Sequence, residues 1–301
     1  MENIQVIKAD LAYNLKAITG EGAIWHPDRN TLFFVDIEGQ KLYEYFPKQN
    51  RCFCWTFEKM VTTVVPETKN TVIIALQNEI IRFNLGTQET NTLACIDDKN
   101  GTLRCNDGKC DPEGRFWFGT MVLDAPPGSA SLYTLLHGGK VKEQLNGITI
   151  SNGIGWSKDE RFMFYIDTQS QKIMRYFFDA GNATIKEDRM LVEVPEDMGS
   201  PDGMTLDADG NLWVAHWNGY GVYCYHGETG KLLAKIEIPV PNVTSCAFGG
   251  EQCNTLFITT ARSGLSMNEL KKYPLSGSLF VCRPGVCGTE TYRFKNKVVK
   301  S

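Results

Sequence analysis

The stretch GSPDGMTLDADGNLWVA (residues 199–215) contains one complete copy of the pattern that predicts the fold. It ends in a short apolar, β-prone run (212–215), and a polar turn (207–210) stands before that run. Equivalent runs recur roughly 40 to 50 residues apart along the whole chain. The other five runs are residues 32–36, 72–76, 116–119, 162–167 and 256–260.

Six units of strand, turn and strand at one period are typical of a β-propeller. No segment shows the sustained 3.6-residue apolar period that would indicate a long helix. Two β-sandwiches, the alternative, would not share one period across the whole chain. We therefore expect an all-β fold, with residues 1–301 forming a single six-bladed β-propeller domain. Residues 4–7 and 278–282 are the candidate strands that close the ring.

Composition and charge limit the possible partners. The 301 residues are 42% apolar and 22% charged, with a net charge of -4 and no basic stripe, so we expect no nucleic-acid or membrane partner. No apolar run approaches the ~18 residues of a membrane span, and the N-terminus does not resemble a signal peptide. A cytoplasmic location and a small-molecule ligand are the resulting expectations. The oligomeric state stays open.

The ten cysteines and four histidines do not form a recognisable metal motif. No two cysteines have the C-x-x-C spacing, and the histidines are isolated from one another. Without a secretion signal, we expect most cysteines to be reduced thiols that pack as small hydrophobes.

Two of the three aspartates in the opening stretch are predicted to be structural. Asp207 and Asp209 belong to the recurrent turn, and Asp-Gly is a preferred pair in such turns. A calcium-binding EF-hand loop starting at Asp207 would need Gly at its sixth position and Glu at its twelfth, but these are Leu212 and Asn218. Asp202 lies outside the turn and needs another explanation.

Asp202 shares its place in the repeat with three other oxygen-bearing residues. Glu21, Asn106 and Asn152 each stand five residues before the turn of their own unit, as Asp202 does. Glycine follows three of the four directly, and it permits close approach between backbones. Equivalent positions in a radially repeated fold lie at equal radius and height, so we expect these four side chains to converge on the central axis.

A cluster of two carboxylates and two amide oxygens is typical of a site for a hard divalent cation. Ca²⁺, Mg²⁺ and Mn²⁺ suit such a set, with Zn²⁺ as a further candidate. Without a cation, two buried carboxylates would repel each other and one would hold a proton. The alternative is that all four are ordinary turn residues, because Asn, Asp and Gly are common in turns. The shared offset favours one divalent cation on the axis.

Several motifs with compatible spacing resemble one protein family. They are GEGAIW (20–25), RCNDGK (104–109), GTM (119–121), ISNG (150–153), PDG (201–203), LWVA (212–215) and TSCAFGG (244–250). From about residue 18 onward, the chain resembles the SMP-30/gluconolactonase/luciferin-regenerating-enzyme (regucalcin-like) family. The resemblance implies a six-bladed propeller with one divalent metal on its axis, which hydrolyses sugar lactones to aldonic acids.

The resemblance also implies roles for individual residues. Glu21, Asn152 and Asp202 match the metal ligands of the family. Arg104 and Asn106 match substrate-binding positions, and Asp124 stands where an animal relative has a Glu that is one methylene longer. Because of that difference, the substrate within the sugar lactones stays open. Residues 123–130 form either a lid over the site or a plain connection between strands.

The resulting hypothesis is a metal-dependent lactonase for an aldonolactone of the gluconolactone, xylonolactone or arabinonolactone type. The metal would act as a Lewis acid on the lactone carbonyl, and Arg104, Asn106 and Asp124 would hold the sugar hydroxyls. Asp202 is the candidate general base. Hydroxide on the metal is the alternative, because a carboxylate bound to a cation is a weak base. Two other classes stay open, a phosphotriesterase or arylesterase and a non-catalytic calcium-binding propeller.

Overall fold

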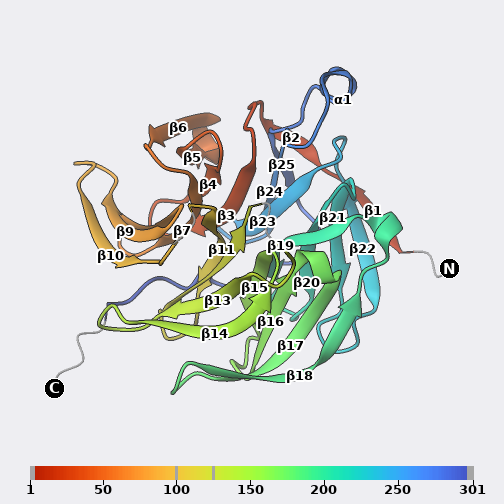
Figure 1. Ribbon diagram of the computed structural model, residues 1–301. Coiled ribbons are helices and arrows are strands. Elements are labelled where there is room, and N and C mark those ends of the chain that lie inside the picture. The colour runs from red at the N-terminus through yellow and green to blue at the C-terminus, as the bar shows by residue number, and fades with distance from the viewer. Residues whose placement is uncertain (1–3, 99–100, 124–125, 297–301) are drawn as a thin grey trace.

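The computed structural model describes residues 4–98, 101–123 and 126–296. These residues form six sheets that surround a central axis, which confirms the predicted all-β, six-bladed propeller (Figure 1). The first strands of neighbouring blades contact one another in a closed ring. The α-helix α1 (Met267–Lys272) has six residues, and no helix within the described ranges is both long and apolar enough for a transmembrane span.

The chain completes one blade before it begins the next, apart from its first two strands. Blades 1 and 2 contain β3 (Gly20–His26), β4 (Thr31–Asp36), β5 (Lys41–Phe46), β6 (Arg51–Thr56), and β7 (Val61–Pro66), β8 (Thr71–Leu76), β9 (Glu79–Asn84), β10 (Thr90–Cys95). Blades 3 and 4 contain β11 (Leu103–Cys110), β12 (Phe116–Val122), β13 (Ala130–Leu135), β14 (Val141–Ile148), and β15 (Ser151–Trp156), β16 (Phe162–Asp167), β17 (Lys172–Asp179), β18 (Thr184–Glu193). Blades 5 and 6 contain β19 (Ser200–Leu206), β20 (Leu212–Trp217), β21 (Gly221–Tyr225), β22 (Leu232–Glu237), and β23 (Val243–Gly249), β24 (Thr255–Thr260), β25 (Leu279–Cys282).

Each of the six predicted apolar runs lies in the second strand of a blade. These strands are buried on both faces because each blade packs between two neighbours, and Phe33, Ile73 and Val214 have no exposed surface. Burial of one such side chain contributes about 2 kcal/mol to stability. The hydrophobic core therefore lies between the blades, and the inner ends of the first strands are left for polar side chains.

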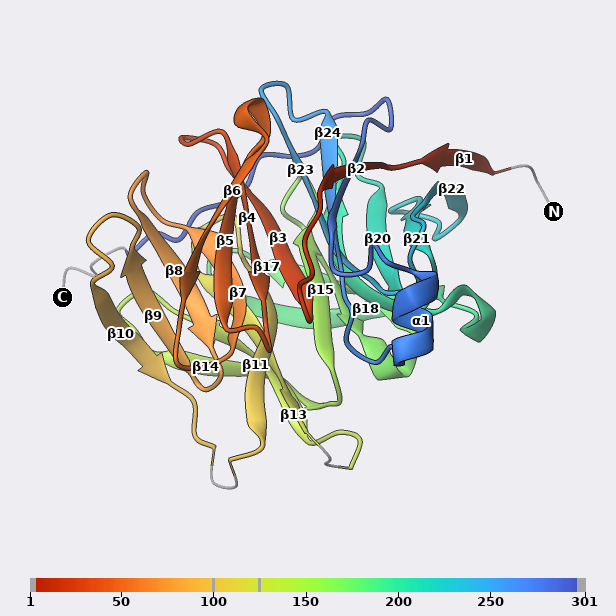
Figure 2. The same cartoon turned by 90° about the horizontal axis from the view of Figure 1, so that it is seen from above.

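The ring closes differently from the prediction at its N-terminal end. Residues 279–282 form β25 as expected, but β25 pairs with β2 (Asp10–Tyr13). The prediction that residues 4–7 would be this partner was wrong. Most of that segment forms β1 (Gln5–Lys8), which pairs in parallel with β22 as a fifth strand of blade 5 (Figures 1 and 2). A short apolar run fits either exposed sheet edge, and the sequence carries no signal for which edge it joins.

Asp207 is structural, as predicted. Its Oδ1 accepts hydrogen bonds from the backbone nitrogens of Asp209 (3.0 Å) and Asn211 (2.8 Å). Its Oδ2 accepts from Asn211 Nδ2 at 3.1 Å and from Trp213 Nε1 at 2.9 Å. Gly210 closes the turn at a φ of 86°, which glycine adopts without strain. The carboxylate thus ties the turn to the indole on the second strand of the blade.

The ten cysteines are free thiols in the structure, in agreement with the expectation of reduced side chains. Half of them are buried and pack as small apolar groups, namely Cys105, Cys110, Cys224, Cys246 and Cys282.

Candidate functional site

The four residues at the repeated offset lie on the first strands of four blades. Glu21 is on β3, Asn106 on β11, Asn152 on β15 and Asp202 on β19. The register between first and second strands shifts at this level in all four blades, and also in blades 2 and 6. A bulge of this kind bends the strand and re-aims a side chain. A strand that buries apolar side chains elsewhere can therefore present a polar one near the axis.

The glycines after Asn152 and Asp202 allow the first strands to approach closely. A Cβ on Gly153 would lie 2.6 Å from the backbone oxygen of Asp202, and one on Gly203 would lie 2.7 Å from Ser245 Oγ. Any larger residue at these places would push neighbouring blades apart. The Asn-Gly and Asp-Gly pairs thus set the spacing between the strands that carry the site.

The four residues line one cavity of about 350 Å³. Arg104, which lies two residues before Asn106 on β11, lines it too. The structure therefore brings five of the six predicted site residues together. The remaining lining residues are Thr19, Ile37, Met121, Ile150, Thr168, Gln169, Ser200 and Trp217.

A directional chain of hydrogen bonds runs through the polar side of the cavity. Arg104 Nη1 donates to Asn106 Oδ1 at 2.5 Å, and Asn106 Nδ2 donates to Asn152 Oδ1 at 2.9 Å. Asn152 Nδ2 then donates to Thr168 Oγ1 at 2.8 Å, and that hydroxyl donates to the backbone oxygen of Pro201 at 2.8 Å. The chain links blades 3, 4 and 5 and gives each amide a defined orientation.

The carboxyl groups of Asp202 and Glu21 are buried, and that of Asp202 is incompletely bonded. Asp202 is 5% exposed, and its Oδ1 has no hydrogen-bond partner. Burial, followed by the charge of Glu21, raises the pKa of Asp202 well above its usual value. Burial and the charge of Asp107 raise the pKa of Glu21 to about 8, although the Gly22 backbone nitrogen donates to its Oε2 at 2.7 Å. Two buried acids that influence each other in this way need a proton or a cation.

Two further charged residues lie close to Glu21 and Asp202, and counting five residues back from each turn did not find them. Asp107 is buried and accepts a hydrogen bond from the backbone nitrogen of Gly108 at 2.7 Å. Lys109 donates to the backbone oxygen of Met204, and burial lowers its pKa against the opposing charge of Asp107. The sequence signal for this pair is that Asp107 stands where the other three units have a glycine, directly after Glu21, Asn152 and Asp202.

The residues present fit a hard divalent cation. Glu21, Asn152 and Asp202 offer only oxygen donors, and the unpartnered Asp202 Oδ1 gives one donor atom that the protein leaves unused. No group of three or more His, Cys, Asp and Glu residues suited to a metal occurs within the described ranges. The set is complete only with the amide oxygen of Asn152, and this favours Ca²⁺, Mg²⁺ or Mn²⁺ over metals that prefer nitrogen or sulfur.

The sixth predicted site residue, Asp124, lies outside the described residues. So does part of the loop 123–130, which therefore stays a predicted lid or connection. Within the described part of that loop, the Gly128 backbone nitrogen donates to Thr149 Oγ1 at 3.0 Å. Thr149 is three residues before Asn152, so this end of the loop is attached beside the strand that carries the site.

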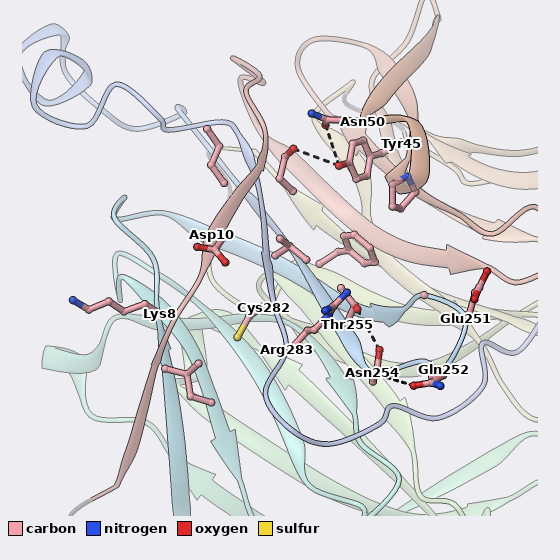
Figure 3. A pocket seen from close by; sticks show the side chains of 17 residues that line it. Lys8, Asp10, Tyr45, Asn50, Glu251, Gln252, Asn254, Thr255, Cys282 and Arg283 are labelled. Carbon is pink, nitrogen blue, oxygen red and sulfur yellow. Dashed lines mark hydrogen bonds between the residues drawn. The ribbon is translucent and has the colours of Figure 1, made fainter.

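A larger groove of about 940 Å³ lies elsewhere, where β2, β5 and the end of β25 meet (Figure 3). Its polar side chains mostly pair with each other or with neighbours at the rim. Tyr45 donates to Asn50 Oδ1 at 3.2 Å, and Asn254 donates to Gln252 Oε1 at 3.1 Å. Glu251 forms an ion pair with Lys48. The smaller cavity on the axis, with buried and unpaired oxygens, is the stronger candidate for chemistry.

Known proteins share both the sequence pattern and the fold. The family model for the SMP-30/Gluconolactonase/LRE-like region matches residues 19–262. Regucalcin of Xenopus laevis is 35% identical over 266 residues, which cover 87% of this chain and 89% of that protein. The Bacillus subtilis protein YvrE, provisionally named a sugar lactone lactonase, is 32% identical over 96% of this chain and 99% of its own length. The solved structure of regucalcin from Agrobacterium tumefaciens, a calcium-binding protein, matches with a TM-score of 0.93 and 24% identity over 98% of this chain and 100% of that one.

Proposed function

The chain belongs to the SMP-30/gluconolactonase/LRE-like family, and from this premise we propose that it hydrolyses an aldonolactone to the aldonic acid with the help of one divalent cation. One observation carries the proposal. The buried Asp202 Oδ1 has no partner, and it belongs to a cavity that also contains Glu21, Asn152 and Arg104. A volume of about 350 Å³ lies at the lower end of the range of about 300 to 1,000 Å³ typical of small-ligand sites.

In this proposal Glu21, Asn152 and Asp202 hold the cation. When bound, it supplies Lewis-acid polarisation of the ester carbonyl and compensates the two buried carboxylates. The oxygen-only donor set makes Ca²⁺, Mg²⁺ and Mn²⁺ the first candidates, with Zn²⁺ after them. The calcium-binding description of the Agrobacterium tumefaciens regucalcin agrees with this choice.

The protein side chains would orient the lactone and move the proton. Asp202 would also accept the proton of the attacking water, because no protein donor occupies its Oδ1 and the two lone pairs of that oxygen can serve the cation and the proton. Arg104 Nε and Nη2 have no hydrogen-bond partner among the described residues, so they can donate to sugar hydroxyls. Asn106 would position that guanidinium, and Asp124 is proposed as a further contact to the sugar.

Two other functions remain candidates. A phosphotriesterase or arylesterase could use the same cation, and Ile37, Met121, Ile150 and Trp217 give it an apolar wall. Against it, the cavity also contains the guanidinium of Arg104 and the carboxamides of Asn106 and Asn152, which suit the hydroxyls of a sugar. A non-catalytic calcium-binding propeller would not require a buried Arg104 beside the cation ligands, where burial lowers the pKa of the guanidinium.

A substrate panel distinguishes the three. The purified protein is assayed with gluconolactone, xylonolactone and arabinonolactone, with an aryl ester and with a phosphotriester, each with chelator and with added Ca²⁺, Mg²⁺, Mn²⁺ or Zn²⁺. Lactone hydrolysis that chelator abolishes and a cation restores is the expected result. Preference for the aryl ester or phosphotriester would replace the proposal by the second function. Cation binding without turnover of any substrate would replace it by the third.

A further inference from the structure

We propose that Thr168 is a positioning residue that orients Asn152 toward the cation and fixes its distance from Asp202. The inference rests on the proposed function only for the presence of a cation. Thr168 lies in the short helical turn η2 (Thr168–Ser170), which follows the second strand of blade 4. It is therefore outside the first-strand offset that revealed the other site residues.

The direction of donation along the hydrogen-bond chain is fixed at both of its ends. Arg104 can only donate, and the backbone oxygen of Pro201 can only accept. Between them, the Thr168 hydroxyl accepts from Asn152 Nδ2 and donates to Pro201. The hydrogen bond to Thr168 thereby fixes which way the Asn152 amide faces, and Oδ1 keeps a second lone pair beside the bond from Asn106. That lone pair is the one available to a cation.

Thr168 is itself held firmly in place. The carboxylate of Asp167 accepts hydrogen bonds from the backbone nitrogens of Thr149 (3.1 Å) and Ile150 (2.9 Å). The Thr168 backbone nitrogen donates to the Ile150 backbone oxygen at 3.1 Å. The turn is therefore attached to the segment that enters β15, two residues before Asn152.

The Thr168 hydroxyl also joins two blades. Its acceptor, Pro201, directly precedes Asp202 on β19, whereas its donor, Asn152, is on β15. One side chain thus connects the strands of two proposed cation ligands. Outer residues that orient a ligand in this way typically change metal affinity 10- to 100-fold when they are removed.

The test compares Thr168→Val with Thr168→Ser. Valine keeps the shape but removes both hydrogen bonds, whereas serine keeps the hydroxyl. Ca²⁺ and Mn²⁺ affinities are measured by calorimetry on chelator-treated protein, alongside lactone kcat and KM and urea unfolding. We expect Thr168→Val to weaken cation binding about 10-fold or more, and Thr168→Ser to restore it to within a few-fold of wild type.

Thr120→Val is the matched control for the loss of a buried hydroxyl. Thr120 Oγ1 donates to the Ser131 backbone oxygen (3.2 Å) and accepts from the Ser131 backbone nitrogen (3.1 Å), but it has no place in the chain through Asn152. The Thr120→Val variant should therefore retain the cation affinity of wild type. Equal affinities for wild type and Thr168→Val would overturn the inference, as would a wild type that binds no cation. If Thr168→Val loses cation affinity but wild type hydrolyses no lactone, the positioning role of Thr168 is supported. Only the proposed lactonase function is then overturned.

Discussion

Asp202 and Asp207 stand five residues apart along one blade, both buried, yet their carboxylates have opposite environments. Asp207 is 0% exposed, and four donors from its own turn and second strand saturate it. Asp202 is 5% exposed, has an unpartnered oxygen and lies close enough to Glu21 for each acid to shift the pKa of the other. The protein completes the hydrogen bonding of one aspartate and leaves the other incomplete.

This difference separates a structural carboxylate from a binding one without reference to any relative. A buried acid with all its acceptors filled contributes to stability, because removing it would leave its donors unpaired. A buried acid with an empty acceptor costs stability until a proton or a cation arrives. Each of the following experiments changes one side of this comparison.

The largest effect is expected from Asp202→Ala. Loss of a cation ligand and of the proposed base should abolish measurable cation binding and lower lactone kcat/KM by about 10³-fold or more. With chelator present, the free energy of unfolding of the variant should equal or exceed that of wild type, because the variant no longer buries this carboxyl group. Calorimetry, lactone kinetics and urea unfolding measure the three quantities. Near-normal kcat would exclude Asp202 from both roles.

The free energy of unfolding of the cation-free protein is expected to change by several kcal/mol with pH. The pKa of Glu21 is raised from 4.5 to about 8, so the folded state binds more protons than the unfolded state between these values. The contribution of Glu21 to the free energy of unfolding is then fully present below pH 4.5 and is lost as pH rises through about 8, by about 1.4 kcal/mol per pH unit for one proton. Buried His26 and His216, whose pKa values are lowered, act in the opposite direction below pH 6.5.

The informative window is therefore pH 6.5 to 8. Urea unfolding in chelator should give a falling free energy of unfolding for wild type and a flatter profile for Glu21→Gln. Saturating cation should remove the fall, because it favours the ionised carboxylates. Equal slopes for wild type and Glu21→Gln would show that Glu21 is not the group that titrates.

A smaller and purely structural effect is expected from Asp207→Ala. The change leaves Trp213 Nε1 and two backbone nitrogens without their acceptor, at a cost of about 3 kcal/mol in the free energy of unfolding. Cation affinity should remain that of wild type. Asp209→Ala, at an exposed position of the same turn, is the matched control and should stay within about 0.5 kcal/mol of wild type. A comparable loss in both variants would argue against the special role of Asp207.

The blades and part of the site could be predicted because they repeat. The second strands are buried alike in all six units, so their apolar runs share one period. Residues at one offset on first strands lie at one level, so counting from the turn found Glu21, Asn106, Asn152 and Asp202. Blades 2 and 6 have Thr62 and Thr244 at this offset, but these hydroxyls donate to the backbone oxygens of Ala75 and Gly20.

The remaining parts of the site depend on contacts that have no sequence period. Asp107 is buried close to Glu21, at a position where the units of Glu21, Asn152 and Asp202 have a glycine, so the repeat does not predict a charged side chain there. Thr168 reaches the site from a turn after a second strand, so its position follows from the fold alone. The pairing of β1 with β22 is a choice between sheet edges, which short apolar runs do not specify.

The pairing of β2 with β25 gives the molecule a late step in its biosynthesis. Residues 10–13 leave the ribosome long before their partner, residues 279–282, is synthesised. At typical translation rates of about 5 to 20 residues per second, the early strand waits on the order of ten seconds to a minute. Under the proposed function, the nascent chain would reach its full affinity for the cation only after that wait, when β2 and β25 pair.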